Sequence, residues 1–293
     1  MYLSKYLKYK MKYLLLSESQ INKIDYIKQK RGGSQQIINF ETLFSHLVEF
    51  IINYNKKKIA NDLNLFGMIN LFQIKGGSSI KYHLMQRGID TTNLTSDIDL
   101  LFFSDDLEEV EKEIIAFYKE LQKTFPSLAW NYNINNGLVT IKIGGGNIID
   151  ISVYDPNFDM DDETSMFAYA LKKLGFKNIK EYYDKITTSD NIEEITFTSL
   201  EFEFFSSQKG IEVIQGYLNA FPSWQASLRY FTQKQIEIET KIPIDDKELE
   251  NVKRIIKGYT KQLSPEYIDN LRNKLERYKR KNEIINSILN SKN

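Results

Sequence analysis

Residues 71–103 have the sequence LFQIKGGSSIKYHLMQRGIDTTNLTSDIDLLFF. An apolar segment is followed by a Gly-Gly-Ser turn, a short amphipathic segment and a second apolar segment. This order predicts a strand, a helix that begins in the turn, and a second strand that carries Asp97 and Asp99. Because side chains on a strand alternate between its two faces, both carboxylates are expected on one face, with Ile98 and Leu100 buried on the other.

The two ends of this segment are expected to bind ligands of opposite charge. Two carboxylates about 7 Å apart on one strand face repel each other unless a cation lies between them. At the turn, Gly76 and Gly77 allow the backbone to come close to a ligand, and the N–H groups at the start of the next helix attract an anion. A divalent metal at one end and a phosphate at the other together indicate a nucleoside triphosphate site.

A third carboxylate follows in a predicted hairpin. Residues 138–143 (LVTIKI) and 147–154 (NIIDISVY) have the pattern of two strands joined by three glycines. Asp150 lies in the middle of the second strand, where burial without a partner costs several kcal/mol. We expect Asp150 to lie across the sheet from Asp97 and Asp99, where Mg²⁺ or Mn²⁺ would remove this cost.

These motifs, in this order, resemble the three-part signature of the DNA polymerase β-like nucleotidyltransferase superfamily. The superfamily includes poly(A) polymerases, CCA-adding enzymes, oligoadenylate synthetases and bacterial abortive-infection toxins. The resemblance covers residues 65–155, and it departs from most branches in a longer interval after the Gly-Ser motif, where residues 86–95 are expected to form an inserted loop. The matching motifs are Gly77-Ser78, Asp97-x-Asp99 and Asp150.

The resemblance implies a role for each of these residues. Asp97 and Asp99 would bind both Mg²⁺ ions of a two-metal site, and Asp150 would bind the catalytic one. Gly77 and Ser78 would hold the β- and γ-phosphates of a nucleoside triphosphate, with ATP favoured.

Charge that develops on the leaving pyrophosphate requires a further cation, which the resemblance places in the helical half. Arg229 and Lys234, about one helical turn apart, are the candidates.

The whole pattern predicts an α+β protein. A small mixed sheet with flanking helices is expected in a nucleotidyltransferase core at 35–158, followed by a mainly helical substrate-binding domain at 159–293. This helical half resembles, in outline only, the substrate-binding half of poly(A)-polymerase-like enzymes. Strands are expected at 66–74, 97–103, 128–134, 138–143 and 147–154, and helices at 37–62, from 78 to 86, at 105–124, 199–218 and 223–239, and from Pro265 onward.

Residues 1–34 are expected to form a separate leader rich in lysine and tyrosine, helical over 1–30. Its KYLKYK motif followed by Gly-Gly resembles the leaders of many giant-virus (mimivirus-like) proteins. Such a segment could lie on nucleic acid, on an anionic membrane or against its own domain.

Positive charge is concentrated at both ends of the chain. Residues 1–35 hold eight lysines and arginines against two acidic residues, and residues 250–293 hold eleven against five. The whole chain is balanced, with 39 basic and 39 acidic residues. Basic ends around an acidic centre are expected to bind RNA, although solvated helix faces explain the same charges.

Composition excludes several classes of site. The chain has no cysteine and two histidines, which excludes disulfides and a zinc cluster and disfavours histidine catalysis. No apolar run approaches the roughly 18 residues of a membrane span, and the first residues lack a secretory cleavage site. We therefore expect a soluble intracellular protein, located in the host cytoplasm or the virion if it is viral.

Three functions remain open at this point. The first is a nucleotidyltransferase that adds nucleotides to an RNA 3′ end, in a poly(A)-polymerase-like role. The second keeps this chemistry but uses a protein, a tRNA or a nucleotide as acceptor, and no feature of the sequence separates it from the first. The third is a non-catalytic virion or interaction protein that keeps the fold. The intact carboxylates favour the two enzymes.

Overall fold

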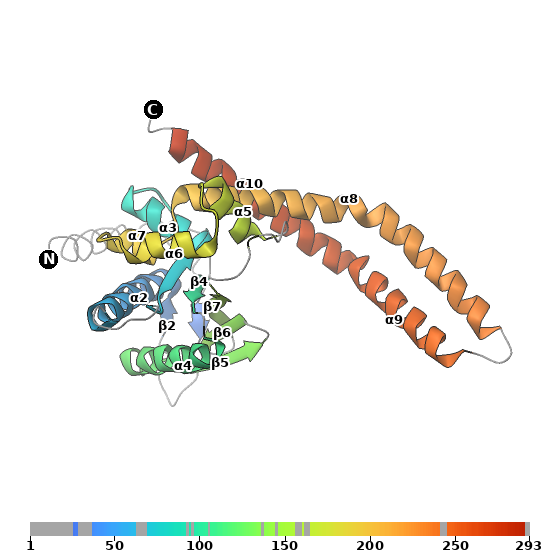
Figure 1. The fold of residues 1–293 in the computed structure, drawn as a ribbon, viewed down its shortest axis with the longest axis horizontal. Helices are drawn as coiled ribbons and strands as arrows, with labels where there is room; N and C mark the ends of the chain where they lie inside the picture. Colours follow the sequence, from blue (N-terminus) through green and yellow to red (C-terminus); the bar gives the residue numbers. More distant parts are fainter. Residues whose placement is uncertain are drawn as a thin grey trace.

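The computed structural model describes residues 26–28, 37–62, 69–91, 94, 97–104, 106–135, 138–143, 146–155, 160, 165–240 and 245–290. Figure 1 shows a sheet with helices around it, from which a long helical arm projects. The strands are β1 (Tyr26–Lys28), β2 (Ile37–Asn39), β3 (Phe72–Lys75), β4 (Ile98–Phe103), β5 (Trp130–Asn135), β6 (Leu138–Ile143) and β7 (Gly146–Tyr154). The helices are α2 (Phe40–Asp62), α3 (Gly76–Gln86), α4 (Leu107–Thr124), α5 (Met166–Lys173), α6 (Ile179–Thr187), α7 (Ile192–Thr196), α8 (Leu200–Glu239), α9 (Asp246–Gln262) and α10 (Pro265–Asn290). The predicted α+β class is confirmed.

The main sheet is mixed and has the strand order β3-β4-β7-β6-β5. β4 and β7 are parallel, and the other neighbouring pairs are antiparallel. The register sets Lys75 opposite Asp99, Asp99 opposite Asp150, and Asp150 opposite Thr140. A row of polar residues therefore crosses four neighbouring strands.

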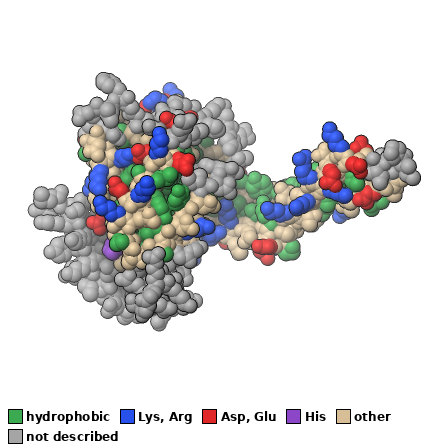
Figure 2. Space-filling model, turned by 90° about the horizontal axis from the view of Figure 1, so that it is seen from below, with side chains coloured by type: hydrophobic (Ala, Val, Ile, Leu, Met, Phe, Trp, Pro, Cys, Tyr) green, Lys and Arg blue, Asp and Glu red, His purple; other side chains and the backbone are tan. Residues whose placement is uncertain are grey.

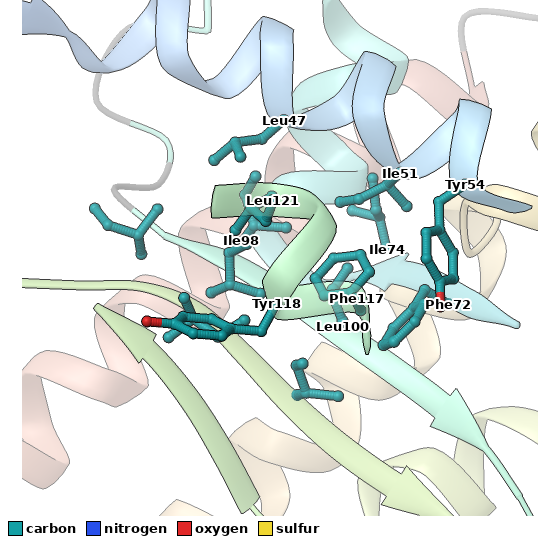
Figure 3. Packing of buried hydrophobic residues seen from close by; sticks show 14 of the residues in the cluster. Leu47, Ile51, Tyr54, Phe72, Ile74, Ile98, Leu100, Phe117, Tyr118 and Leu121 are labelled. Atoms are coloured by element: carbon teal, nitrogen blue, oxygen red, sulfur yellow. The ribbon is translucent and has the colours of Figure 1, made fainter. Parts of the chain in front are cut away.

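One face of the sheet is covered by α2 and α4. In Figure 3, Leu47 of α2 and Leu121 of α4 pack above the sheet residues Ile98 and Leu100. Phe117 of α4 is fully buried, and its ring centroid lies 4.3 Å from that of Phe72 and 5.2 Å from that of Tyr54. Burial of these large apolar side chains fixes β4 in the middle of the sheet.

The other face is only partly covered by α5, α6 and the start of α8. Leu101 and Phe103, in the second half of β4, are fully buried against these helices. Asp99 lies on the same face as these two residues, one alternation earlier in the strand, and is half-buried. The polar row therefore lies at the margin of this second core.

The arm consists of α8, α9 and α10. α8 has 40 residues and is about 60 Å long, and α9 and α10 run back along it toward the sheet (Figure 1). At the tip, Ile238 of α8 packs with Leu249 and Val252 of α9. At the base, Ile285 and Ile288 of α10 pack with side chains of α3. The last helix therefore ends beside the core.

Two features of the fold differ from the sequence prediction. The helix expected over residues 1–30 is a strand at its described part, because β1 pairs antiparallel with β2. β2 itself occupies residues 37–39, where the first turn of the helix 37–62 was expected. Its β-branched residues Ile37 and Ile38 favour a strand over a helical turn. The rest of the leader lies outside the described residues. Residues 219–222 connect the two helices predicted in the arm into the single helix α8, with Pro222 inside it. Pro222 is exposed, so water can satisfy the carbonyl group that its ring frees.

Within the described residues, none of the helices combines the length and the apolarity needed to cross a membrane.

Phe117 provides a test of the core. We expect Phe117→Ala to lower the free energy of unfolding by about 3–5 kcal/mol, since it removes a fully buried ring and leaves a cavity. Lys119→Ala, on the exposed side of the same helix, should change it by less than about 0.5 kcal/mol. Urea denaturation followed by circular dichroism measures both, and a loss below about 1 kcal/mol for Phe117→Ala would contradict this packing.

Candidate metal centre

The structure brings the three predicted aspartates together. Asp97 directly precedes β4, Asp99 lies within it, and Asp150 is the neighbour of Asp99 in the parallel strand β7. One carboxylate oxygen from each lies within 4.8 Å of the others. We refer to these residues as the acidic triad.

The turn between β3 and α3 sets the position of the triad. The hydroxyl of Ser78, which is fully buried, donates a hydrogen bond to the backbone carbonyl of Asp97 at 2.6 Å. This bond uses the one donor of the hydroxyl and holds the start of β4 against α3. In this arrangement the side chain of Ser78 orients Asp97 and does not offer its proton to a phosphate.

Gly76 is required by the backbone and by the space around it. Its φ is +65°, a conformation that residues with a Cβ rarely adopt. A Cβ at this position would lie 2.6 Å from Oδ2 of Asp99, closer than such atoms approach. Glycine therefore lets the turn pass directly beside a carboxylate of the triad.

A fourth carboxylate comes from the helical half of the chain. Oε1 of Glu203, in the first turns of α8, accepts hydrogen bonds from the N–H of Gly76 at 2.7 Å and from the hydroxyl of Thr198 at 2.5 Å. Thr198 in turn is bound through its N–H to the carbonyl of Ile74 in β3, at 2.9 Å. Glu203 therefore occupies the first N–H group of the predicted phosphate-binding turn. No local pattern of residues indicates a role for Glu203, because its partner is 127 positions away.

Electrostatic repulsion acts within the triad. Burial, together with the negative charge of Asp97, raises the pKa of Asp99 to about 6, although Lys75 and Lys281 act in the opposite direction. Lys75 donates a hydrogen bond to the hydroxyl of Ser152 at 3.1 Å. Burial lowers the pKa of Lys75, against the attraction of the surrounding carboxylates. A further cation beside Asp99 would relieve this repulsion.

The donor atoms fit a divalent metal ion. Oδ1 of Asp150 is buried, and no described group forms a hydrogen bond with it. A buried carboxylate oxygen without a partner is costly, whereas Mg²⁺ and Mn²⁺ bind to oxygen ligands of this kind. Three close aspartate carboxylates could therefore hold a divalent ion.

The last helix also reaches the site. Tyr278 of α10 packs its ring against Gly210 of α8, where a Cβ would lie 2.9 Å from the ring. Burial raises the pKa of Tyr278, and the charge of Asp99 adds to this effect. Lys281, one turn further along α10, acts on Asp99 as described above. The sequence placed both residues on the last helix but could not place them at the triad.

The two cations predicted for the pyrophosphate lie far along the arm. Arg229 is 26 residues after Glu203 on the same helix, which corresponds to about 39 Å along the axis. Arg229 is exposed, and Lys234 forms an ion pair with Glu248 of α9 at 2.8 Å. The structure does not bring these residues to the triad, whereas the charges of Lys75 and Lys281 act on Asp99.

Comparisons of the chain with protein-family models, with curated proteins and with solved structures find no match. Function is therefore inferred from the sheet, the triad and the groups that surround it.

Gly76 and Gly88 form a matched pair for a first test of the site. Both have positive φ, but a Cβ on Gly88 would meet nothing within 4 Å. We expect alanine at either position to lower the free energy of unfolding by about 1–2 kcal/mol. Only Gly76→Ala should lose most of the rise in melting temperature that Mg²⁺ causes, because its methyl group displaces Asp99. Calorimetry with and without Mg²⁺ checks this, and an equal Mg²⁺ response in the two variants would contradict it.

Asp150 provides a second test. A ligand that binds only the folded state at about 100 times its Kd stabilises that state by about 2.7 kcal/mol. We expect Mg²⁺ to stabilise the wild type in this way and Asp150→Asn by less than half as much. Asp184→Asn, in an exposed ion pair with Lys180, is the control and should respond like the wild type. The same stabilisation in Asp150→Asn would show that Asp150 is not a ligand.

Proposed function

We propose that the protein is a metal-dependent nucleotidyltransferase that moves a nucleoside monophosphate from a nucleoside triphosphate, with ATP favoured, to the 3′ hydroxyl of an RNA. The observation that supports this most is the acidic triad, held by two parallel strands with its oxygens within 4.8 Å. The order of the Gly-Ser turn and the three aspartates, which resembles the DNA polymerase β-like signature, is the second support.

The reaction follows from these groups. The oxygen of the acceptor hydroxyl attacks the α-phosphorus, the bond from this phosphorus to the oxygen that bridges to the β-phosphate breaks, pyrophosphate leaves, and the hydroxyl proton passes to solvent. Mg²⁺ or Mn²⁺, when bound, would supply positive charge to the reacting phosphate oxygens. Asp97, Asp99 and Asp150 would hold the metal. The N–H groups at the start of α3 would attract the triphosphate.

The helical half would orient these groups. Glu203 holds Gly76 in the conformation that lets the turn approach Asp99. Lys75, within the polar row, would keep the four carboxylates from repelling an incoming triphosphate. Both residues act on the position and charge of the triad, so we assign them to positioning and not to the chemistry itself.

The decisive experiment is a transfer assay with each of the four labelled nucleoside triphosphates and with RNA, tRNA and protein acceptors, in Mg²⁺ or Mn²⁺. We expect incorporation into RNA, and at least a 10²-fold to 10³-fold loss of rate in Asp97→Asn and in Asp99→Asn, which removes a ligand charge without changing the side-chain shape. Asp184→Asn should keep wild-type activity.

Each alternative has its own result in this assay. Transfer to protein, tRNA or a free nucleotide, with the same loss in both aspartate variants, would keep the chemistry and change the acceptor. Wild-type activity in Asp99→Asn would exclude the triad as the catalytic centre. No transfer to any acceptor would favour the non-catalytic protein.

A further inference from the structure

α10 presents a row of three cations on one of its faces. Lys274, Arg277 and Lys281 are spaced at i, i+3 and i+7, which places them on one side of a helix. Ile288, seven residues after Lys281, continues this side and is buried against Ile80 and other side chains of α3. The cationic row (Lys274, Arg277 and Lys281) therefore lies beside the side of α10 that packs on the core.

The base of the arm is held firmly at this point. The side-chain amide of Asn282 donates a hydrogen bond to the carbonyl of Phe204 in α8 at 3.2 Å, and the ring of Tyr278 packs on Gly210. Nζ of Lys274 and Nζ of Lys281 each lie 6.0 Å from the centre of the Tyr278 ring. The row thus has a defined position, and its last member lies nearest to the triad.

The cations of the row form no direct ion pair in the described residues, although the charge of Lys281 acts on Asp99. Both Lys274 and Arg277 are exposed. By contrast, Arg272 pairs with Asp269 at 3.5 Å on another side of the same helix. Close cations repel each other, and an anionic ligand would reduce this repulsion.

The same spacing recurs on the neighbouring helix. Arg254, Lys257 and Lys261 of α9 are again at i, i+3 and i+7, and all three are exposed. α9 and α10 follow one another along the arm (Figure 1), and Figure 2 shows lysine and arginine side chains along the arm on the face seen there. From residue 254 to residue 281 the two helices cover about 40 Å. Three phosphates of one nucleotide cannot occupy this length, whereas a polynucleotide backbone can.

The arm also carries exposed aromatic rings, on α8. Tyr217 and Tyr230 of α8 are 42% and 62% exposed, and Tyr217 is in ring contact with Trp224. Proteins that bind single strands combine cations along the backbone with aromatic faces on which unpaired bases stack. A duplex would not offer its base faces to such rings.

We propose that the cationic row and its continuation on α9 bind the phosphodiester backbone of single-stranded RNA and lead the strand along the arm to the acidic triad. The second part of this inference, that the RNA strand reaches the triad, rests on the proposed function, in which this RNA is the acceptor. Binding itself requires no catalysis, so it can be tested separately.

The test compares two variants that remove the same charge from the same helix. One is Lys274→Gln/Arg277→Gln/Lys281→Gln, in the row; the other is Arg272→Gln/Lys279→Gln/Arg280→Gln, on the other sides of α10. Glutamine keeps the helix propensity of the residues that it replaces, and circular dichroism and melting temperature verify the fold. The probe is a labelled single-stranded RNA 20-mer, titrated by fluorescence anisotropy at several salt concentrations.

We expect the row variant to bind this RNA at least tenfold more weakly than the control variant. The slope of log affinity against log salt should fall by about 2, because each lost phosphate contact on a single strand contributes about 0.7. Equal weakening in both variants would overturn the proposal, since net charge alone would explain it, and so would unchanged binding in both. If the triple variant does not fold, the exposed pair Lys274→Gln/Arg277→Gln replaces it, with an expected fall in slope of about 1.4.

A second measurement distinguishes the binding of RNA from the binding of the triphosphate. ATP binding, measured by calorimetry in Mg²⁺, should be unchanged within threefold in the exposed pair variant Lys274→Gln/Arg277→Gln, which keeps Lys281 beside the triad. Weaker ATP binding with unchanged RNA binding would assign the row to the triphosphate and overturn the proposal. RNA binding that is weakened only in the row variant, in a protein that shows no transfer activity, would therefore support the proposed RNA-binding surface and exclude the proposed function.

Discussion

Repulsion between the carboxylates of Asp97, Asp99 and Asp150 is opposed by the apolar packing of the strands that carry them. The register of β4 and β7 sets Asp99 beside Asp150 and, on the opposite face, Ile98 beside Ile149. Both isoleucines are fully buried under α2 and α4, and each square ångström of apolar surface removed from water contributes about 25 cal/mol. The hydrophobic core thus holds together charges that would separate in water. A divalent cation would stabilise this arrangement without any change in the sheet.

The two halves of the chain are joined at this same place. Glu203 belongs to the helical half, yet its carboxylate accepts the N–H of Gly76 in the turn that faces Asp99. α10 returns along α8 and packs on α3, with Tyr278 at the triad. The turn, the triad and the base of the arm therefore form one connected unit. Because buried polar contacts require fixed geometry, a shift of α8 or α10 would move the groups around the triad.

Charge is separated within a chain that has no formal net charge. Carboxylates gather at the sheet, and cations follow α9 and α10 toward it. Because salt screens exposed charges beyond about 10 Å, the outer cations act on a polyanion along the arm and not on the triad. Near Lys281 the positive potential of the helical cations meets the negative potential of the triad. The triad would repel a phosphate there until a metal ion compensates the charge of its carboxylates. Metal and polyanion binding should therefore favour each other.

The sequence by itself determined the α+β class, the turn at Gly76 and the two strands that carry the triad. These features follow from residue spacing within single segments, where alternation, glycine and capping act locally. The tertiary structure alone decided that Glu203 closes the turn, that Lys281 and not Lys234 lies near Asp99, and that α8 continues through a proline. Such contacts join residues 127 or more positions apart, and they depend on how helices pack, which no local pattern of residues encodes.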